Sequence, residues 1–351
     1  MEQCALIMAG GKGTRFWPKS TDEKPKQFLN LIGNQTMIQM TYDRINKLIS
    51  KEKIFVVTCK KYKELVQEQL PELPEKNIII EPEGRNTAPC ILLATLYIKQ
   101  FFENAEIAVF PSDHIVNDED MFVDELKLAL DYIENENQNA IITLGISPNR
   151  PETGYGYIKC SDEIARKDKF DIVKVERFVE KPNIEKAKQY LEDGKYLWNA
   201  GMFIFHADYM LEELRNNLPD EYQLLVNLPR ISEPDYTVKL EEKYSQCESI
   251  SIDYAVMEKS NNIYVIPSKF GWDDIGTWKS LQRYIEEDND SNIIKGDVDT
   301  YNSKNNVIYA GDKKIIILGL DNIFCIESDN MIVIGNKDEL NNVHEYRKKY
   351  C

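Results

Sequence analysis

The chain has 351 residues, 42% hydrophobic and 29% charged, which is enough to bury a large core and is typical of a globular protein. Its formal net charge of −16 disfavours binding to the phosphate backbone of a nucleic acid. Basic residues nevertheless gather near the start of the chain, at Lys12, Arg15, Lys19, Lys24 and Lys26. This local reversal of sign points to a site for a small anion.

The sequence gives little sign of a targeting segment, or of cysteines arranged for disulfides or metal binding. The first residues do not combine a basic leader with an apolar stretch, and no apolar run approaches the ~20 residues that span a bilayer. Seven cysteines are scattered along the chain and form no CxxC pair with metal-site spacing. We therefore expect reduced thiols in a cytoplasmic protein, with neither a membrane nor a nucleic acid as partner.

Apolar β-branched runs alternate with longer amphipathic segments over the first part of the chain, which predicts an α/β fold. We expect a mixed, mostly parallel, Rossmann-like sheet with helices on both faces. The predicted strands are Cys4–Met8, Ile54–Thr58, Asn77–Glu81, Ile107–Phe110 and Ala140–Leu144. The predicted helices are Thr36–Ile49, Thr87–Phe102 and Met121–Glu134.

The second half has a mixed pattern. Extended segments are predicted at Ile172–Glu180 and Trp198–Phe205, and helices near Ile184–Glu192, Tyr209–Asn216 and Ile252–Lys259. From about residue 290, short β runs between Asn, Asp and Gly turns predict a small β appendage closed by a helix near Lys337–Lys349. This gives a large domain, residues 1–288, and a small β-rich domain, residues 289–351, with no internal repeat predicted.

A glycine-rich loop follows the first predicted strand directly, reading Ala9-Gly10-Gly11-Lys12-Gly13-Thr14-Arg15. Glycines at this place let backbone N–H groups approach a polyphosphate, and such a concavity attracts anions. The loop matches neither GxxxxGK[ST] nor the dinucleotide fingerprint GxGxxG with its acidic partner. A turn without a ligand remains the alternative for this loop considered alone.

The residues after the loop make the pattern more specific. The segment LIMAGGKGTRFWPKSTDEKPKQFL, residues 6–29, resembles the signature of sugar-nucleotide pyrophosphorylases, and its WP and PKQF details resemble the mannose-1-phosphate guanylyltransferase branch. Seven later segments resemble that branch in the same order: EPEGRNTAP, PSDH, TGYGYI, FVEKP, WNAGMF, SIDYAVMEK and GWDDIGTW. The stretch Lys19–Glu23 departs from the pattern by being more acidic.

The resemblance implies a nucleotidyltransferase domain over residues 1–288. Its expected reaction is transfer of GMP from GTP to α-D-mannose 1-phosphate, giving GDP-mannose and pyrophosphate by direct in-line attack with Mg²⁺. A phosphate monoester is mostly dianionic at pH 7, because its second pKa is about 6, so the attack needs no general base. Two alternatives stay open: a different pair of nucleotide and sugar 1-phosphate, and a non-catalytic regulatory relative that binds a sugar nucleotide. A homodimer is also expected.

Two carboxylates are candidates for the metal site, Asp113 and Asp274. Asp113 follows a predicted strand at the sheet edge where open α/β sheets bind ligands, although an Asx-type turn would also explain it. Two carboxylates, with phosphate oxygens and water completing the octahedron, suit Mg²⁺. The neighbouring Asp273 is ambiguous from its position alone, and the family pattern selects Asp274.

The resemblance also assigns the substrate contacts. Arg15 and Lys26 are expected to bind the triphosphate, since Arg offers a planar fork and Lys a movable point charge. Lys181 resembles the lysine that holds the sugar phosphate, Glu180 and Asn199 resemble residues that bind sugar hydroxyls, and Gly156 allows close approach. The full expected nucleotide set is Ala9, Gly10, Gly11, Gly13, Thr14, Arg15, Lys26, Arg85, Asn86, Thr87 and Asp113.

Overall fold

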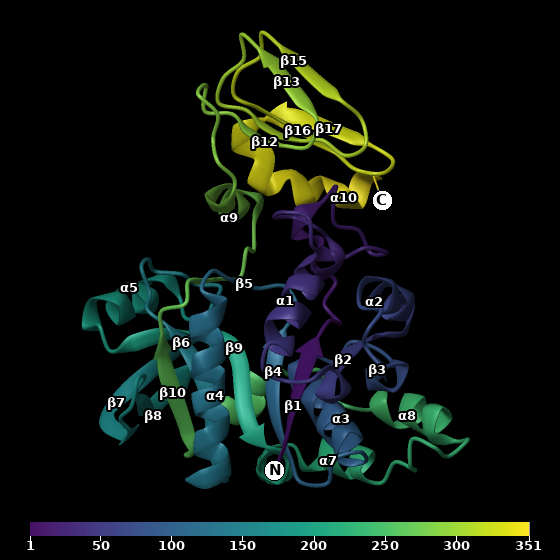
Figure 1. Ribbon diagram of the computed structural model, residues 1–351, viewed down its shortest axis with the longest axis vertical. Coiled ribbons are helices and arrows are strands. Elements are labelled where there is room, and N and C mark those ends of the chain that lie inside the picture. Colours follow the sequence, from purple (N-terminus) through teal and green to yellow (C-terminus); the bar gives the residue numbers. More distant parts are fainter. Residues whose placement is uncertain (351) are drawn as a thin grey trace. The chain divides into compact units, whose positions relative to one another are not determined.

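The structure is a computed structural model that describes residues 1–350 (Figure 1). The chain forms two compact units, each assembled from separate stretches of sequence. Unit 1 contains Met1–Gly10, Thr41–Ser112 and Val116–Trp272, and unit 2 contains Gly11–Met40, Asp113–Ile115 and the chain from Asp273 onward. This grouping differs from the boundary between residues 288 and 289 expected from the sequence. The division into domains 1–288 and 289–351 stays a prediction.

Unit 1 is built on a nine-stranded sheet in the order β3-β2-β1-β4-β9-β6-β10-β8-β7. Neighbours among β1, β2, β3 and β4 pair in parallel, whereas β9 runs antiparallel to both β4 and β6. The predicted mixed, mostly parallel α/β sheet is therefore confirmed. Its strands are β1 (Glu2–Met8), β2 (Ile54–Cys59), β3 (Ile78–Glu81), β4 (Ala105–Pro111), β6 (Ile141–Ile146), β7 (Tyr157–Arg166), β8 (Ile172–Val179), β9 (Tyr196–His206) and β10 (Ile263–Ser268).

Helices cover both faces of this sheet. Successive residues of β4 point to opposite faces, so Ile107 and Val109 enter a core shared with α3 (Thr87–Lys99) and α6 (Ala207–Asn217). On the other face, Phe110 meets Phe122 of α4 (Glu119–Asn135) with ring centroids 5.8 Å apart. The remaining helices of the chain are α1 (Met37–Asn46), α2 (Lys63–Gln69), α5 (Ile184–Asp193), α7 (Pro219–Val226), α8 (Tyr236–Tyr244), α9 (Trp278–Leu281) and α10 (Arg347–Tyr350).

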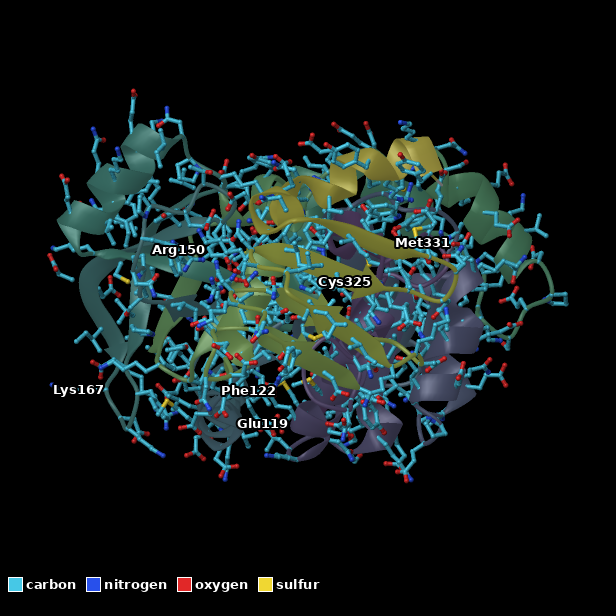
Figure 2. The ribbon with its side chains drawn as sticks, turned by 90° about the horizontal axis from the view of Figure 1, so that it is seen from above. Glu119, Phe122, Arg150, Lys167, Cys325 and Met331 are labelled. Atoms are coloured by element: carbon cyan, nitrogen blue, oxygen red, sulfur yellow. The ribbon has the colours of Figure 1, made fainter. Side chains whose placement is uncertain are left out.

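Unit 2 contains a coil of short strands. The chain alternates between a sheet in the order β12-β14-β16-β17 and a two-stranded sheet of β13 and β15, and the successive turns stack in parallel. The last strand, β17, instead runs antiparallel to its neighbour β16. The strands are β12 (Ile293–Lys295), β13 (Val298–Tyr301), β14 (Val307–Tyr309), β15 (Ile315–Leu318), β16 (Ile323–Glu327) and β17 (Ile332–Asn336). In Figure 2, Cys325 is labelled on β16 and Met331 just before β17.

The coil does not stand alone within unit 2. Phe16, Trp17 and Leu29 from the N-terminal segment share one buried core with Val307 and Phe324 of the coil. The indole nitrogen of Trp278 also donates to the backbone oxygen of Trp17, at 3.2 Å. The glycine-rich loop and the residues after it therefore fold together with the chain from Asp273 onward, although more than 200 residues separate the two segments in sequence.

Several elements differ from those predicted. Residues Lys337–Tyr346 form a 3-10 helix followed by the short α10, where one continuous helix was expected. Ile252–Lys259 contains a π-helix, Asp253–Met257. The parallel coil is a repeat in backbone geometry, although no repeat was predicted. Two further short strands are β5 (Ile115–Val116) and β11 (Trp272–Asp273). Among residues 1–350, no helix combines the length and apolar character needed to cross a bilayer.

Candidate active site

The glycine-rich loop is held in unit 2 by the short helix Lys26–Phe28. Gly13 has φ +46°, and a Cβ there would lie 2.7 Å from the backbone nitrogen of Lys26. Only glycine meets both conditions, the left-handed backbone and the close approach. The side-chain amide of Gln27 donates to the carbonyl of Gly11 at 2.9 Å and fixes the other end of the loop.

Lys26 joins the two candidate metal ligands. The residue is 5% exposed, and its ammonium donates to the backbone oxygens of Asp113, at 2.8 Å, and Asp274, at 2.5 Å. It also forms an ion pair with the Asp113 carboxylate, with Nζ and Oδ2 2.9 Å apart. Three residues that are distant in sequence therefore meet in one polar cluster, which we call the lysine–carboxylate cluster.

The Asp113 carboxylate is kept ionised in this cluster. Burial opposes the charged form, but the ammonium of Lys26 and the ring of His114 outweigh it and lower the pKa of Asp113. Its side chain remains 32% exposed, so the oxygens are accessible. A Cβ at Gly276 would lie 3.3 Å from both Arg15 Nη1 and Asp274 Oδ2. Arg15 therefore lies on the same side of the cluster as Asp274, and glycine leaves room between them.

Asp273 and Asp274 have different surroundings. Asp273 is buried, pairs with Arg283, accepts from the Tyr284 hydroxyl at 3.1 Å, and accepts from the backbone N–H of Ile275 at 2.9 Å. Ile275 has φ +39°, which is strained for a β-branched residue, and this hydrogen bond helps to hold it there. The Asp273 carboxylate is thus occupied by contacts that hold the turn. This supports Asp274 as the candidate metal ligand.

The lysine–carboxylate cluster fits a magnesium ion. No group of three or more His, Cys, Asp or Glu side chains within residues 1–350 is arranged to hold a metal on its own. Mg²⁺ is commonly bound by one or two carboxylates together with substrate phosphates and water. Asp113 and Asp274 supply that protein share, so the donor set matches an ion that binds together with a phosphorylated substrate.

A second polar cluster lies in unit 1, around Asn199 of β9. Its backbone N–H donates to the Gly156 carbonyl at 2.8 Å, and its side-chain oxygen accepts from Gly201 N, at 3.0 Å, and Thr143 Oγ1, at 3.2 Å. These contacts orient the amide so that Nδ2 donates to Asp253 Oδ1 at 3.1 Å. The orientation of Asn199 is therefore fixed before any ligand binds.

Glu180 and Lys181 belong to the same cluster. A Cβ on Gly156 would lie 2.6 Å from Glu180 Oε2, so glycine is required here by the packing of Glu180, and close approach of a sugar at this position stays a prediction. Lys181 Nζ pairs with Glu180 Oε1 at 2.7 Å, with the lysine side chain 60% exposed and the glutamate side chain 7%. Burial opposes the charge on Lys181, but Glu180 raises the pKa of the amine above its usual value.

Asp253 was not among the residues predicted for the site. It lies at the start of the π-helix, and such helices often occur at functional sites. Burial, and then the charge of Glu180, raise the pKa of Asp253 to about 7. The segment SIDYAVMEK was part of the family resemblance, but nothing in its spacing singled out this aspartate.

The expected base and triphosphate contacts in unit 1 are partly engaged with other protein groups. Arg85 Nη2 donates to Glu83 at 2.8 Å and to the Ser245 carbonyl at 2.6 Å, and the Thr87 hydroxyl accepts from Ile252 N at 2.8 Å. Asn86 caps α3, with its Oδ1 accepting from Thr87 N at 2.9 Å. Their roles toward a nucleotide stay predictions.

Ala9 and Gly10 are the last two residues of the first stretch of unit 1, Met1–Gly10, and they begin the glycine-rich loop. The Ala9 N–H donates to Val57 and its carbonyl accepts from Thr58 Oγ1 at 2.9 Å. A Cβ on Gly10 would lie 3.0 Å from Glu81 Oε2, and Glu81 accepts from the Tyr244 hydroxyl at 2.6 Å. Glu81, buried beside Gly10, is a second residue that the sequence reasoning did not single out.

These features together define the class of protein. A mixed α/β sheet leads from β1 into a glycine-rich turn, a buried lysine binds the backbone oxygens of two aspartates and the carboxylate of one of them, and a separate polar cluster surrounds an oriented asparagine. This combination is typical of enzymes that act on nucleoside phosphates.

The comparisons with known proteins agree. The family model for nucleotidyl transferases matches residues 4–291. Mannose-1-phosphate guanylyltransferase of Salmonella montevideo is 39% identical over 350 residues, covering 98% of this chain and 73% of the relative. The alginate biosynthesis protein AlgA of Pseudomonas putida is 36% identical, covering 98% and 70%. A crystal structure described as mannose-1-phosphate geranyltransferase from Thermus thermophilus has a TM-score of 0.84 at 30% identity and covers 100% of this chain and 99% of that one.

The chain belongs to the nucleotidyl transferase family, in its mannose-1-phosphate guanylyltransferase branch. The resemblance expected from the sequence is therefore confirmed.

Proposed function

We propose that this chain transfers GMP from GTP to α-D-mannose 1-phosphate, forming GDP-mannose and pyrophosphate. An oxygen of the sugar phosphate forms a bond to the α-phosphorus of GTP, and the bond from that phosphorus to the oxygen bridging the α- and β-phosphates breaks. The bridging oxygen leaves with pyrophosphate. The observation that carries this proposal is the buried Lys26 bound to both Asp113 and Asp274, since it gathers cation and carboxylates where a triphosphate and its metal would bind.

The expected mechanism is positioning and charge neutralisation. Asp113 and Asp274 would hold Mg²⁺, which would supply positive charge to the triphosphate oxygens. Lys26 and Arg15 would neutralise further negative charge, and the glycine-rich loop would present backbone N–H groups. No protein base is required, because the attacking phosphate is already ionised near pH 7, with a second pKa of about 6.

The cluster around Asn199 is proposed to select the sugar. Lys181 is exposed and can bind the sugar phosphate, while Glu180 and the oriented amide of Asn199 can bind hydroxyl groups. A site that pairs with particular hydroxyls rejects an epimer because its own polar groups would be left unpaired. Asp253 is proposed as a positioning residue that keeps the Asn199 amide in its orientation.

The test is pyrophosphate release from GTP, ATP, UTP and dTTP, each paired with mannose 1-phosphate and glucose 1-phosphate, with and without Mg²⁺. We expect release with GTP and mannose 1-phosphate only, and its loss on chelation. The variant Asp274→Asn should reduce kcat at least about 100-fold, as expected when a ligand to a charge-stabilising metal is lost. Asp290→Asn, at an exposed aspartate of unit 2, is the matched control.

The other outcomes point elsewhere. Release with a different pair would keep the transfer chemistry and assign the chain to another substrate. Silence of the folded protein with every pair, together with binding of GDP-mannose, would favour the regulatory relative.

We also propose a cytoplasmic location and a homodimer. The homodimer is supported by exposed apolar side chains on one face of the β13–β15 sheet: Tyr301 is 69% exposed, Ile316 57% and Leu318 64%. Tyr301 lies directly opposite Leu318 in the strand register, so the exposed groups adjoin. We call these three residues the apolar strip.

A further inference from the structure

Unit 2 contains a cavity that the proposed transfer reaction does not use. Its volume is about 590 Å³, within the range of sites for small ligands. Its walls come from the segment around Lys19 and Asn30 and from the coil around Lys295, Tyr309 and Glu327. None of these residues belongs to the lysine–carboxylate cluster.

Three lysines, Lys19, Lys295 and Lys313, line the cavity beside three carboxylates, and two of these lysines, Lys19 and Lys295, are candidates for binding an anion. Lys295 Nζ donates to the backbone oxygens of Asn30 and Gly33, so its described hydrogen bonds go to neutral carbonyls. Burial, and then the nearby Lys19, lower the pKa of Lys295 to about 8. Burial also lowers the pKa of Lys19. Glu327, Asp329 and Asp312 partly offset the cost of burial at Lys19, whereas Lys295 has the charge of Lys19 against it; an anion bound between the two amines would stabilise the charge on Lys295.

A second, independent feature of the cavity is the hydroxyl of Tyr309. The residue lines the cavity and is 2% exposed, and its hydroxyl oxygen has no hydrogen-bond partner among the side chains and backbone that the structure describes. A buried hydroxyl without a partner is costly, so a ligand that bonds to it would recover that free energy.

The acidic residues of the cavity narrow the choice of anion. Glu327 is buried and already accepts from Gly311 N at 2.8 Å, with Lys313 at 3.7 Å. Asp312 and Asp329 are exposed at the edge, where they would repel a polyphosphate but can accept hydrogen bonds from hydroxyl groups. A ligand with one phosphate and several hydroxyls meets both conditions.

We propose that this cavity is a second binding site, for the phosphate monoester of a small polyol such as a hexose phosphate. Its phosphate lies between Lys19 and Lys295 and accepts from the Tyr309 hydroxyl, and its hydroxyl groups donate to Asp312 and Asp329. The site includes Lys19, which lies in the stretch where the sequence departs from the family pattern.

Isothermal titration calorimetry tests this site without turnover. The probes are inorganic phosphate and a hexose 6-phosphate, whose anomeric carbon carries no phosphate that could accept GMP. A double-variant background, Arg15→Met with Lys181→Met, weakens phosphate binding at the lysine–carboxylate cluster and at the proposed sugar-phosphate contact, so the remaining binding reports the cavity. We expect one site per chain, with the hexose 6-phosphate bound more tightly than phosphate.

Substitutions in the cavity identify the site. Lys295→Met and Lys19→Met should each weaken binding at least about tenfold, as expected for the loss of one charge-assisted hydrogen bond. Tyr309→Phe removes a single oxygen and should weaken it about threefold. Lys314→Met, at an exposed lysine paired with Asp297 and Asp299, is the matched control and should bind like the parent.

The proposal would be overturned by absence of binding in the folded parent, or by unchanged affinity in the Lys19→Met and Lys295→Met variants. If the Lys295→Met variant does not fold, the affinities measured for the Lys19→Met and Tyr309→Phe variants test the proposal instead. Equal affinities for phosphate and hexose 6-phosphate would assign the cavity to free phosphate and contradict the polyol part. Because no step of the transfer reaction is measured, each of these results is separate from the test of the proposed function.

Discussion

The backbone at Gly156 lies so close to polar side chains that an added methyl group would collide with them. Its Cβ would lie 2.6 Å from Glu180 Oε2 and 3.3 Å from Asn199 Cβ. Gly156→Ala must therefore displace Glu180 or the loop. We expect KM for mannose 1-phosphate to rise about tenfold and KM for GTP to change less than about twofold, since a misplacement of the sugar contacts is enough to cost binding.

Gly154 provides the matched control for this change. It lies in the same loop, and a Cβ there would meet only the Glu152 carboxylate, at 3.4 Å. Steady-state kinetics of Gly154→Ala should resemble those of the parent. Equal effects of the two variants, or an equal rise in both KM values for Gly156→Ala, would mean that Gly156 acts through loop stability and not through the sugar contacts.

At the residue scale, local sequence singled out the candidate phosphate-binding groups but not all of the polar groups that the structure places in the two clusters. Gly13 and Lys26 could be predicted because they lie in short, distinctive segments, and the structure brings them into contact. Asp253 is one of 59 acidic residues, and its significance comes from Asn199, 54 positions away. Similarly, Asp273 and Asp274 are adjacent in sequence and differ only in what folds against each of them.

Helices and strands could be predicted from the sequence where a single pattern of apolar residues was clear. The parallel strands β1, β2 and β4 are buried on both faces and read as apolar runs, and α3 is apolar nearly all round. By contrast, β7 has several exposed and half-buried residues and its register shifts repeatedly, so its sequence lacks a clear alternation. The 3-10 geometry of Lys337–Tyr346 is likewise set by tertiary packing, since a helical pattern does not distinguish the two helix types.

The coil in unit 2 depends on side-chain amides that bridge successive turns. The side-chain oxygen of Asn292 accepts from Asn306 N at 3.0 Å, and that of Asn306 accepts from Ile323 N at 3.0 Å. Asn306 Nδ2 also donates to the Leu320 carbonyl at 2.8 Å. Such contacts replace backbone hydrogen bonds where the chain turns from one sheet to the other.

We expect Asn306→Ala to lower the free energy of unfolding by about 1–3 kcal/mol, because two part-buried backbone groups lose their partners. Chemical denaturation followed by fluorescence would measure it. Lys304→Ala is the control, since the side chain of this exposed lysine pairs with Asp290 at the surface and its backbone hydrogen bonds are kept in the variant, and it should change stability by less than about 0.5 kcal/mol. A small effect of Asn306→Ala would mean that water replaces the amide.

At the scale of the whole molecule, the net charge of the protein and the charges of its proposed substrates have the same sign. The net charge is −16, and GTP and mannose 1-phosphate are both anions. Under the proposed function, binding rests on local cations, for which Arg15 and Lys26 in unit 2 and Lys181 in unit 1 are the candidates, because long-range attraction is lacking. Affinity for both substrates should accordingly depend on these few residues and not on the surface as a whole.

The apolar strip allows a prediction about assembly. The exposed isoleucine and leucine side chains of β15, beside Tyr301 of β13, are unfavourable in water, and covering them by a second copy would remove that cost. Sedimentation velocity over a range of protein concentrations should show a dimer. The double variant Ile316→Asp and Leu318→Asp should be monomeric, because the new carboxylates would have to be buried beside apolar groups.

Val238 on α8 in unit 1 is equally exposed, at 65%, but is isolated, so Val238→Asp should remain dimeric. If the parent is a monomer at every concentration, no homodimer forms and the strip has another role. If the double variant stays dimeric and folded, the contact lies elsewhere on the chain. A monomeric variant with unchanged kcat would show that each copy carries out the reaction alone, whereas loss of activity on dissociation would mean that assembly supports the site.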